Sequence, residues 1–272
     1  MGCGGKTAVW CYNLRVMAKK TQTITRKSRL SPALKGGLAL VLPVLAGQLV
    51  LGVIGGTTAD MEGGTAVAPV LAAVGVVSWL LGMLWYGVSG LGLRGGRPLF
   101  AGIGFASLGW VAFLLFRFLT VEIENIGPPG SGRLFLYLLV FEAFAIQVWT
   151  FGVLFRALAE WRGPLTAAVS SGLVFGATGF LLFRESFLSD NSMALIYFFL
   201  WGVLYGVIRL RTGSILGMVI VQAMQSFTAW VALTPVAEPV MTQLQNLYLL
   251  AGVAYLVFIW RLWPKQEEDY RV

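Results

Sequence analysis

The stretch of sequence that decides the fold is LFLYLLVFEAFAIQVWTFGVLF, residues 134–155. Glu142 is the one charged residue among these 22, and an α-helix that crosses a bilayer needs about 20 mostly apolar residues. The whole chain of 272 residues is also strongly apolar. Of its residues, 57% are hydrophobic and 12% are charged, and the mean hydropathy is +0.79. Soluble domains carry about twice that share of charge. The sequence therefore predicts an all-α integral membrane protein.

Outward from this stretch, seven more apolar runs are separated by Gly, Pro or polar breaks. The eight expected spans are residues 37–54, 68–90, 99–121, 134–155, 165–183, 193–210, 214–233 and 244–263. This pattern divides the chain into a basic N-terminal segment (1–36), three helices (37–133), a four-helix core (134–233) and a last helix with a tail (234–272).

The basic residues predict the orientation in the membrane. Of 20 Lys and Arg, 17 lie before the first span, after the last one, or in alternate connections such as those holding Arg94 and Arg209. The opposite connections hold only Arg133 and Arg184. Because Lys and Arg are retained in cytoplasmic loops, we expect both termini in the cytoplasm and the protein in a bacterial plasma membrane.

Composition excludes many kinds of site. The chain has no His and only two Cys, Cys3 and Cys11, so a metal site built on imidazole or several thiolates is excluded. Nucleophile pairs that use His are excluded as well. The net charge of +8 is distributed between apolar blocks, and we expect no nucleic-acid partner and no cofactor.

The N-terminus leaves two starting points open. Met1-Gly2-Cys3 opens like an acylation signal, but Lys6 stands where Ser or Thr is required. Met17 is an alternative start of translation.

The segment from Phe151 to Ser226 carries a set of spaced landmarks. Phe151-Gly152-Val153-Leu154-Phe155-Arg156 is followed by Phe175-Gly176-Ala177-Thr178-Gly179, then by Arg211-Thr212-Gly213-Ser214, Gln222 and Ser226. In order and spacing, this segment resembles the CPBP family, the intramembrane proteases that include type II CAAX prenyl endopeptidases and bacteriocin-processing proteins. The resemblance implies a CPBP-like helical core.

The same comparison shows which family residues are missing. The family's Glu-Glu-x-x-x-Arg motif falls on Phe151, Gly152 and Arg156, so only the Arg and the Phe before it, Phe155, are kept. Its Phe-x-x-x-His motif keeps Phe175 and has Gly179 in place of His. Its later His and Asn positions hold Gln222 and Ser226.

These replacements bear directly on chemistry. In the family, the paired Glu and His residues are taken to hold a metal or to activate water, which requires ligands or a general base. The four replacing residues Phe151, Gly152, Gly179 and Gln222 can accept no proton near neutral pH. We therefore expect no catalytic residues and no metal site, and an apolar pocket where these positions meet.

Glu142 is the deepest carboxylate of the apolar core and has two interpretations. A functional one makes it a ligand for substrate, pigment or cation, or a proton carrier, because ionisable groups inside membranes are often functional. The structural one, which we favour, pairs it with Ser170, Ser171, Gln222 or Ser226 of neighbouring helices. Gln147, five residues further on, is expected on a different helix face.

Three functions follow from these observations. The first is a catalytically inactive CPBP-like protein that binds other membrane proteins, as a binding module or accessory subunit. The second is an endopeptidase with an altered active site that uses Glu142. The third and weakest is a small transporter component, because helices broken in mirrored positions are not seen. The expected partners are the lipid bilayer and other membrane proteins.

Overall fold

The computed structural model describes residues 30–55, 67–126, 131–182, 192–237 and 239–271. The first helices are α2 (Pro32–Val53), α3 (Val67–Trp85), the short α4 (Gly87–Gly90) and α5 (Arg97–Thr120). One long helix then follows in five parts, α6 (Ser131–Tyr137), η2 (Leu138–Phe144), α7 (Ala145–Gln147), η3 (Val148–Leu154) and α8 (Phe155–Arg162). The remaining helices are α9 (Pro164–Leu182), α10 (Ser192–Thr212), α11 (Leu216–Phe227), η4 (Thr228–Ala232), α12 (Met241–Leu262) and η5 (Glu267–Asp269).

Seven helices among the described residues are long and apolar enough to cross a membrane. They match seven of the eight expected spans, with ends that differ by a few residues. The largest difference is in the fourth, which runs for 32 residues from Ser131 to Arg162. Two parts of it, η2 and η3, are π-helical, a form that occurs mostly as single turns inside α-helices and often at functional sites.

The remaining expected span is a shorter helix that still joins the two ends of the bundle. At its start, the Ser214 hydroxyl donates to the carbonyl of Arg94, 2.7 Å away, just before α5 begins. At its end, Leu233 pairs with Ile126, just after α5 ends. At about 1.5 Å per residue, residues 216–232 extend about 25 Å. Most of α11 is buried by neighbouring helices, and a helix enclosed by protein can be shorter than the bilayer.

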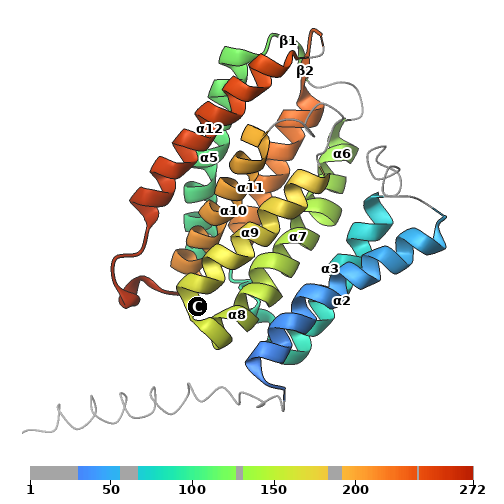
Figure 1. The fold of residues 1–272 in the computed structure, drawn as a ribbon, viewed down its shortest axis with the longest axis vertical. Coiled ribbons are helices and arrows are strands. Elements are labelled where there is room, and N and C mark those ends of the chain that lie inside the picture. Colours follow the sequence, from blue (N-terminus) through green and yellow to red (C-terminus); the bar gives the residue numbers. More distant parts are fainter. Residues whose placement is uncertain (1–29, 56–66, 127–130, 183–191, 238, 272) are drawn as a thin grey trace, which may run out of the picture.

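A short β-ribbon, which the sequence did not predict, lies at the end of the bundle where α5 and η4 terminate. Strand β1 (Ile123–Ile126) pairs antiparallel with β2 (Leu233–Pro235), beyond the ends of α5 and η4 (Figure 1). The Arg117 guanidinium donates from Nη2 to the carbonyl of Leu233, 2.9 Å away. Strand pairing satisfies backbone groups of the residues that follow these two helices, which have no helical partners.

Helix α2 begins five residues before the expected span, at Pro32. The Ser31 side chain accepts a hydrogen bond from the amide of Leu34, and Pro occupies the first helical position, as is common at helix N-termini. Helices α2 and α3 form a pair beside the rest of the bundle (Figure 1). The indole of Trp149 in η3 donates to the Ala39 carbonyl, 2.9 Å away, and so fixes α2 against the long helix.

Both described ends of the chain lie at the same end of the bundle. The start of α2 and the C-terminus lie opposite the β-ribbon (Figure 1). This arrangement agrees with an even number of crossings. The side of the membrane that this end faces, and the domain boundaries at 36, 133 and 233, stay predictions. The start sites Met1 and Met17 lie outside the described residues.

Candidate functional site

The motif positions lie on the long helix, α9 and α11. Phe151 and Gly152 are in η3, and its π-helical hydrogen bonds run from residue i to residue i+5. The ring of Phe151 packs on that of Phe175 in α9, with centroids 5.5 Å apart. The structure therefore brings the first and second motifs together, through aromatic side chains.

Side chains of other elements pack closely on the two glycines of these motifs. A Cβ added to Gly179 would lie 2.9 Å from Cδ1 of the buried Phe198. A Cβ on Gly152 would lie 3.3 Å from Cδ2 of Leu91. Both distances are shorter than ordinary contacts of about 3.5–4.0 Å between carbon atoms. A larger residue at either position would therefore require Leu91 or Phe198 to shift.

Gln222 and Ser226 contact a second set of polar residues on the long helix. The Ser226 hydroxyl donates to Oε1 of Glu142, 2.6 Å away. Nε2 of Gln147 donates to Oε1 of Gln222, 2.8 Å away. All four side chains are buried, and we call them the polar seam. They join the long helix to α11 in the middle of the bundle.

The polar seam favours the structural interpretation of Glu142. Of its four expected partners, Ser226 donates to it, whereas Ser171 donates to the carbonyl of Ala167 in its own helix. The position of Gln147 differs from the expectation. In η2 the π-helical bonds run from residue i to i+5, and this wider turn brings residues five apart back toward one face. Sequence periodicity based on 3.6 residues per turn misses this rotation.

A small cavity borders the polar seam. Its volume is about 10 Å³, about the room that one water molecule needs. Its lining residues are Phe113, Tyr197, Phe198, Trp201, Gln225, Ser226, Ala229 and Tyr248. Of the motif positions, only Ser226 borders this cavity. Phe151, Gly152, Gly179 and Gln222 are not among its lining residues, and the apolar pocket expected where these positions meet stays a prediction.

A tyrosine pair completes the polar contacts beside this cavity. Nε2 of Gln225 donates to the hydroxyl oxygens of Tyr197 and Tyr255, at 2.7 and 3.0 Å. Among the described residues, no group of three or more His, Cys, Asp or Glu lies close enough to hold a metal ion. The arrangement can therefore fix helices to one another, and it shows no set of metal ligands in this part of the chain.

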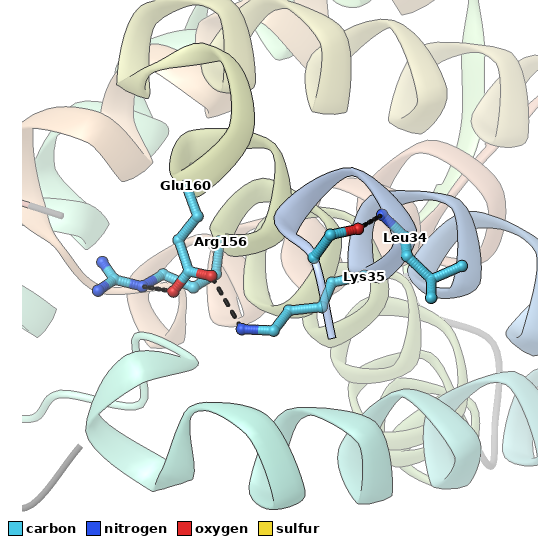
Figure 2. Close-up of polar contacts among 5 residues, drawn as sticks. Leu34, Lys35, Arg156 and Glu160 are labelled. Carbon is cyan, nitrogen blue, oxygen red and sulfur yellow. Dashed lines mark hydrogen bonds and ion pairs between the residues drawn. The ribbon is translucent and has the colours of Figure 1, made fainter. Parts of the chain in front are cut away.

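The motif Arg156 lies at the far end of the long helix, away from the polar seam. Its Nε is 4.0 Å from Oε1 of Glu160, and Oε2 of that carboxylate accepts from Lys35 at 3.0 Å (Figure 2). Arg209, expected in a loop, is instead buried within α10. Arg209 donates to the carbonyl of Phe151, which compensates for part of its loss of water. The expected span 193–210 already included Arg209 near its end, and its assignment to a connection was wrong.

Comparison with known proteins finds a family similarity for part of the chain. Residues 128–228 match the family model described as type II CAAX prenyl endopeptidase Rce1-like. This range contains both motifs, the polar seam and the long helix. No curated protein and no solved structure matches the chain.

Proposed function

We propose that this chain, whose residues 128–228 are Rce1-like, is a catalytically inactive relative of the CAAX prenyl endopeptidases that acts by binding other membrane proteins. In this proposal it is a binding module or accessory subunit of a complex in a bacterial plasma membrane, with both termini in the cytoplasm. The resemblance accounts for the retained helical core. The filled motif positions account for the loss of hydrolysis.

The aromatic packing at the motif positions is the observation that most directly supports the absence of peptidase activity. The ring of Phe175 lies 5.5 Å from those of Phe151 and Tyr205 and 5.4 Å from that of Trp201. All four side chains are buried. Peptide hydrolysis needs a water molecule held beside a base or a metal ion. Closely packed rings leave little room for such a water. The polar atoms of these four side chains are the Tyr205 hydroxyl and the Trp201 indole nitrogen, and neither accepts a proton near neutral pH.

The altered protease remains the second candidate because of one contact. Ser226 stands where the family has Asn, and its hydroxyl donates to Glu142. A carboxylate therefore lies beside a motif position, and a carboxylate can act as a general base. Against this candidate, Glu142 is the one carboxylate of residues 134–155, and no group of three or more His, Cys, Asp or Glu among the described residues could hold a metal ion.

Reconstitution tests the two candidates against each other. The purified full chain is placed in liposomes with membrane-anchored peptides, including prenylated CAAX peptides, and new peptide termini are sought by mass spectrometry. An active CAAX prenyl endopeptidase in the same liposomes is the positive control. We expect no cleavage by the wild type or by Glu142→Gln. Cleavage by the wild type that Glu142→Gln abolishes, with folding retained, would establish the altered protease.

The binding role has a separate test. The tagged chain is crosslinked in its native membranes, extracted in mild detergent and weighed by native mass spectrometry. We expect a complex of fixed stoichiometry with another membrane protein, which Glu142→Gln leaves intact. A chain that stays alone at native expression, with and without crosslinking, would contradict the proposal.

A further inference from the structure

The chain turns back after α12, and its last described segment returns to the bundle. This segment lies at the end of the bundle where α2 begins, and it finishes beside α8 and α9 (Figure 1). We call residues 264–271 the tail. A hydrogen bond of 3.2 Å from the Lys265 amide to Oδ2 of Asp269 closes the tail around the short turn η5. The tail is therefore an ordered segment that lies against the bundle.

Three consecutive residues of the tail contact the bundle, each in a different way. Oδ1 of Asp269 lies 3.9 Å from Nη2 of Arg211, in the last turn of α10. The ring of Tyr270 packs on a buried apolar cluster, which consists of Phe155, Ala167, Ala168 and Leu210. The amide of Arg271 donates to the carbonyl of Leu210, 2.8 Å away. An acidic group, an aromatic ring and a backbone amide are thus bound in sequence.

The end of α10 is suited to accept a peptide backbone. Leu210 is one of the last four residues of this helix, whose carbonyls have no partner within it. The Leu210 carbonyl can therefore accept from the amide of any residue except proline. Gly213 follows with a φ of +70°, and a Cβ added to it would contact the Arg271 carbonyl. The missing side chain lets the tail approach this closely.

The contacts of the tail are of a kind that opens readily. The side chains of Asp269 and Arg211 are 36% and 31% exposed, and ion pairs with such exposure stabilise little because water screens them. Residues 265–268 are exposed as well. Segments with few buried apolar contacts open at the lowest free-energy cost in a protein. We therefore expect the tail to exchange between a docked and a released state.

We propose that the surface under the tail is a docking site for a segment of a partner membrane protein, and that the tail is its displaceable occupant. We call this surface, made of Phe155, Leu210, Arg211 and Gly213, the tail site. The partner segment has an acidic residue for Arg211, then an aromatic residue for the apolar cluster, then a residue with a free amide. This inference rests on the proposed binding role and names the surface that performs it.

The test measures binding of a peptide of residues 264–272, blocked at both ends, to the full chain in detergent. A short tether gives its own segment an effective concentration on the order of millimolar, so the peptide is titrated into that range and its binding is followed by its NMR line widths. Three chains are compared, namely the wild type, Tyr270→Ala and Arg271→Pro. The last two weaken docking of the chain's own tail. The thermal unfolding temperature checks that each chain is folded.

The docked tail should compete with the peptide in the wild type. Its apparent affinity is then reduced by the fraction of chains whose site is open. We expect Tyr270→Ala and Arg271→Pro to bind the peptide about threefold or more tightly than the wild type does. Tyr270 has φ −82° and ψ 125°, a conformation that residues before proline adopt. Proline at 271 therefore removes the amide donor without strain at Tyr270.

Substitutions in the peptide and in the tail site test recognition with the Tyr270→Ala chain. The Arg271→Pro peptide should bind about fivefold or more weakly than the Arg271→Ala peptide, which keeps the amide, because one hydrogen bond is lost. Adding Arg211→Gln to the chain should weaken binding of the unchanged peptide. The matched control is Arg97→Gln, an exposed arginine at the start of α5, which should leave this binding unchanged.

Two results would overturn the proposal. One is equal binding of the peptide by the wild type and both released variants, and the other is equal binding of the Arg271→Pro and Arg271→Ala peptides. Because the assay needs no natural partner, either result leaves the complex sought by native mass spectrometry unaffected. A chain that binds the peptide as expected but stays alone in its native membranes would contradict the proposed function and support the tail site.

Discussion

Glu142 distinguishes two possible roles of the polar seam. Its carboxyl either joins two helices by a hydrogen bond, or it transfers a proton or binds a cation. It is 5% exposed and accepts a hydrogen bond from Ser226. A buried carboxyl that serves only as an acceptor can be replaced by a carboxamide, which keeps the acceptor oxygen and the shape. A carboxyl that moves a proton or binds a cation cannot be replaced in this way.

We therefore expect Glu142→Gln to change the free energy of unfolding by less than about 1 kcal/mol, since hydrogen bonds between membrane helices average about 0.6 kcal/mol. Glu142→Leu removes the acceptor and should cost about 1–3 kcal/mol, because the Ser226 hydroxyl then loses its partner. Both values come from unfolding of the purified protein in detergent. If Glu142→Gln kept its stability and its complex but failed to restore growth or another defect caused by deletion of the chain, proton transfer or cation binding would replace the contact role.

At the scale of elements, glycines set how closely α9 and α10 approach. A Cβ on Gly172 would lie 2.6 Å from the carbonyl oxygen of Gly202, and Gly176 and Gly206 make similarly close approaches between these helices. Small residues at such interfaces let helix backbones pack directly in a membrane. This contact positions Phe175 against the rings of α10.

Gly172→Ala should therefore force the two helices apart and destabilise the protein by about 1–3 kcal/mol, as overpacked cores do. The matched control is Gly104→Ala in α5, where an added Cβ meets nothing within 4 Å. Since Ala is about 1 kcal/mol better than Gly inside a helix, the control should be neutral or stabilising. Thermal unfolding of both variants is the measurement. Equal effects of the two substitutions would show that the close approach of α9 and α10 contributes nothing to the free energy of unfolding.

One indole hydrogen bond and one ion pair join α2 to the long helix, in addition to the apolar packing of Ala39 in the cluster with Val153, Leu154 and Ala157. Trp149 donates to the Ala39 carbonyl, and Lys35 pairs with Glu160. Trp149→Phe keeps most of the ring packing but loses the donor, so the cost should be about 1 kcal/mol. Trp260→Phe is the control, because Trp260 is 69% exposed. Proteolysis of folded protein should cleave near α2 faster in Trp149→Phe only, and the same rate in both variants would contradict this attachment.

For the whole molecule, the prediction concerns orientation. Single cysteines are introduced at Glu62, Pro128, Asp190 or Glu238, and at Arg94 or Arg97, after Cys3 and Cys11 have been replaced. The first group should react with an impermeant reagent added outside cells, and the second only after permeabilisation, because the basic residues follow the positive-inside rule. Arg209 is unsuitable because it is buried. Outside labelling at Arg94 would reverse the orientation.

The helices and their order could be predicted from the sequence, because apolar runs near 20 residues have one stable state in a bilayer, the hydrogen-bonded helix. The CPBP resemblance could be found in the same way, since Phe155, Arg156 and Phe175 keep the motif spacing. The loss of acid and base groups also needed only residue identity, because Gly152 and Gly179 have no titratable side chain.

The tertiary structure alone decided how these parts meet. Gln147 and Glu142 meet Gln222 and Ser226 in one seam, the β-ribbon joins the segments that follow α5 and η4, and Arg209 enters the core beside the Phe151 carbonyl. Each of these contacts joins residues that are far apart in the chain. Hydropathy and local periodicity describe how one segment meets lipid and its own backbone, and they contain no information about which distant group will satisfy a buried donor.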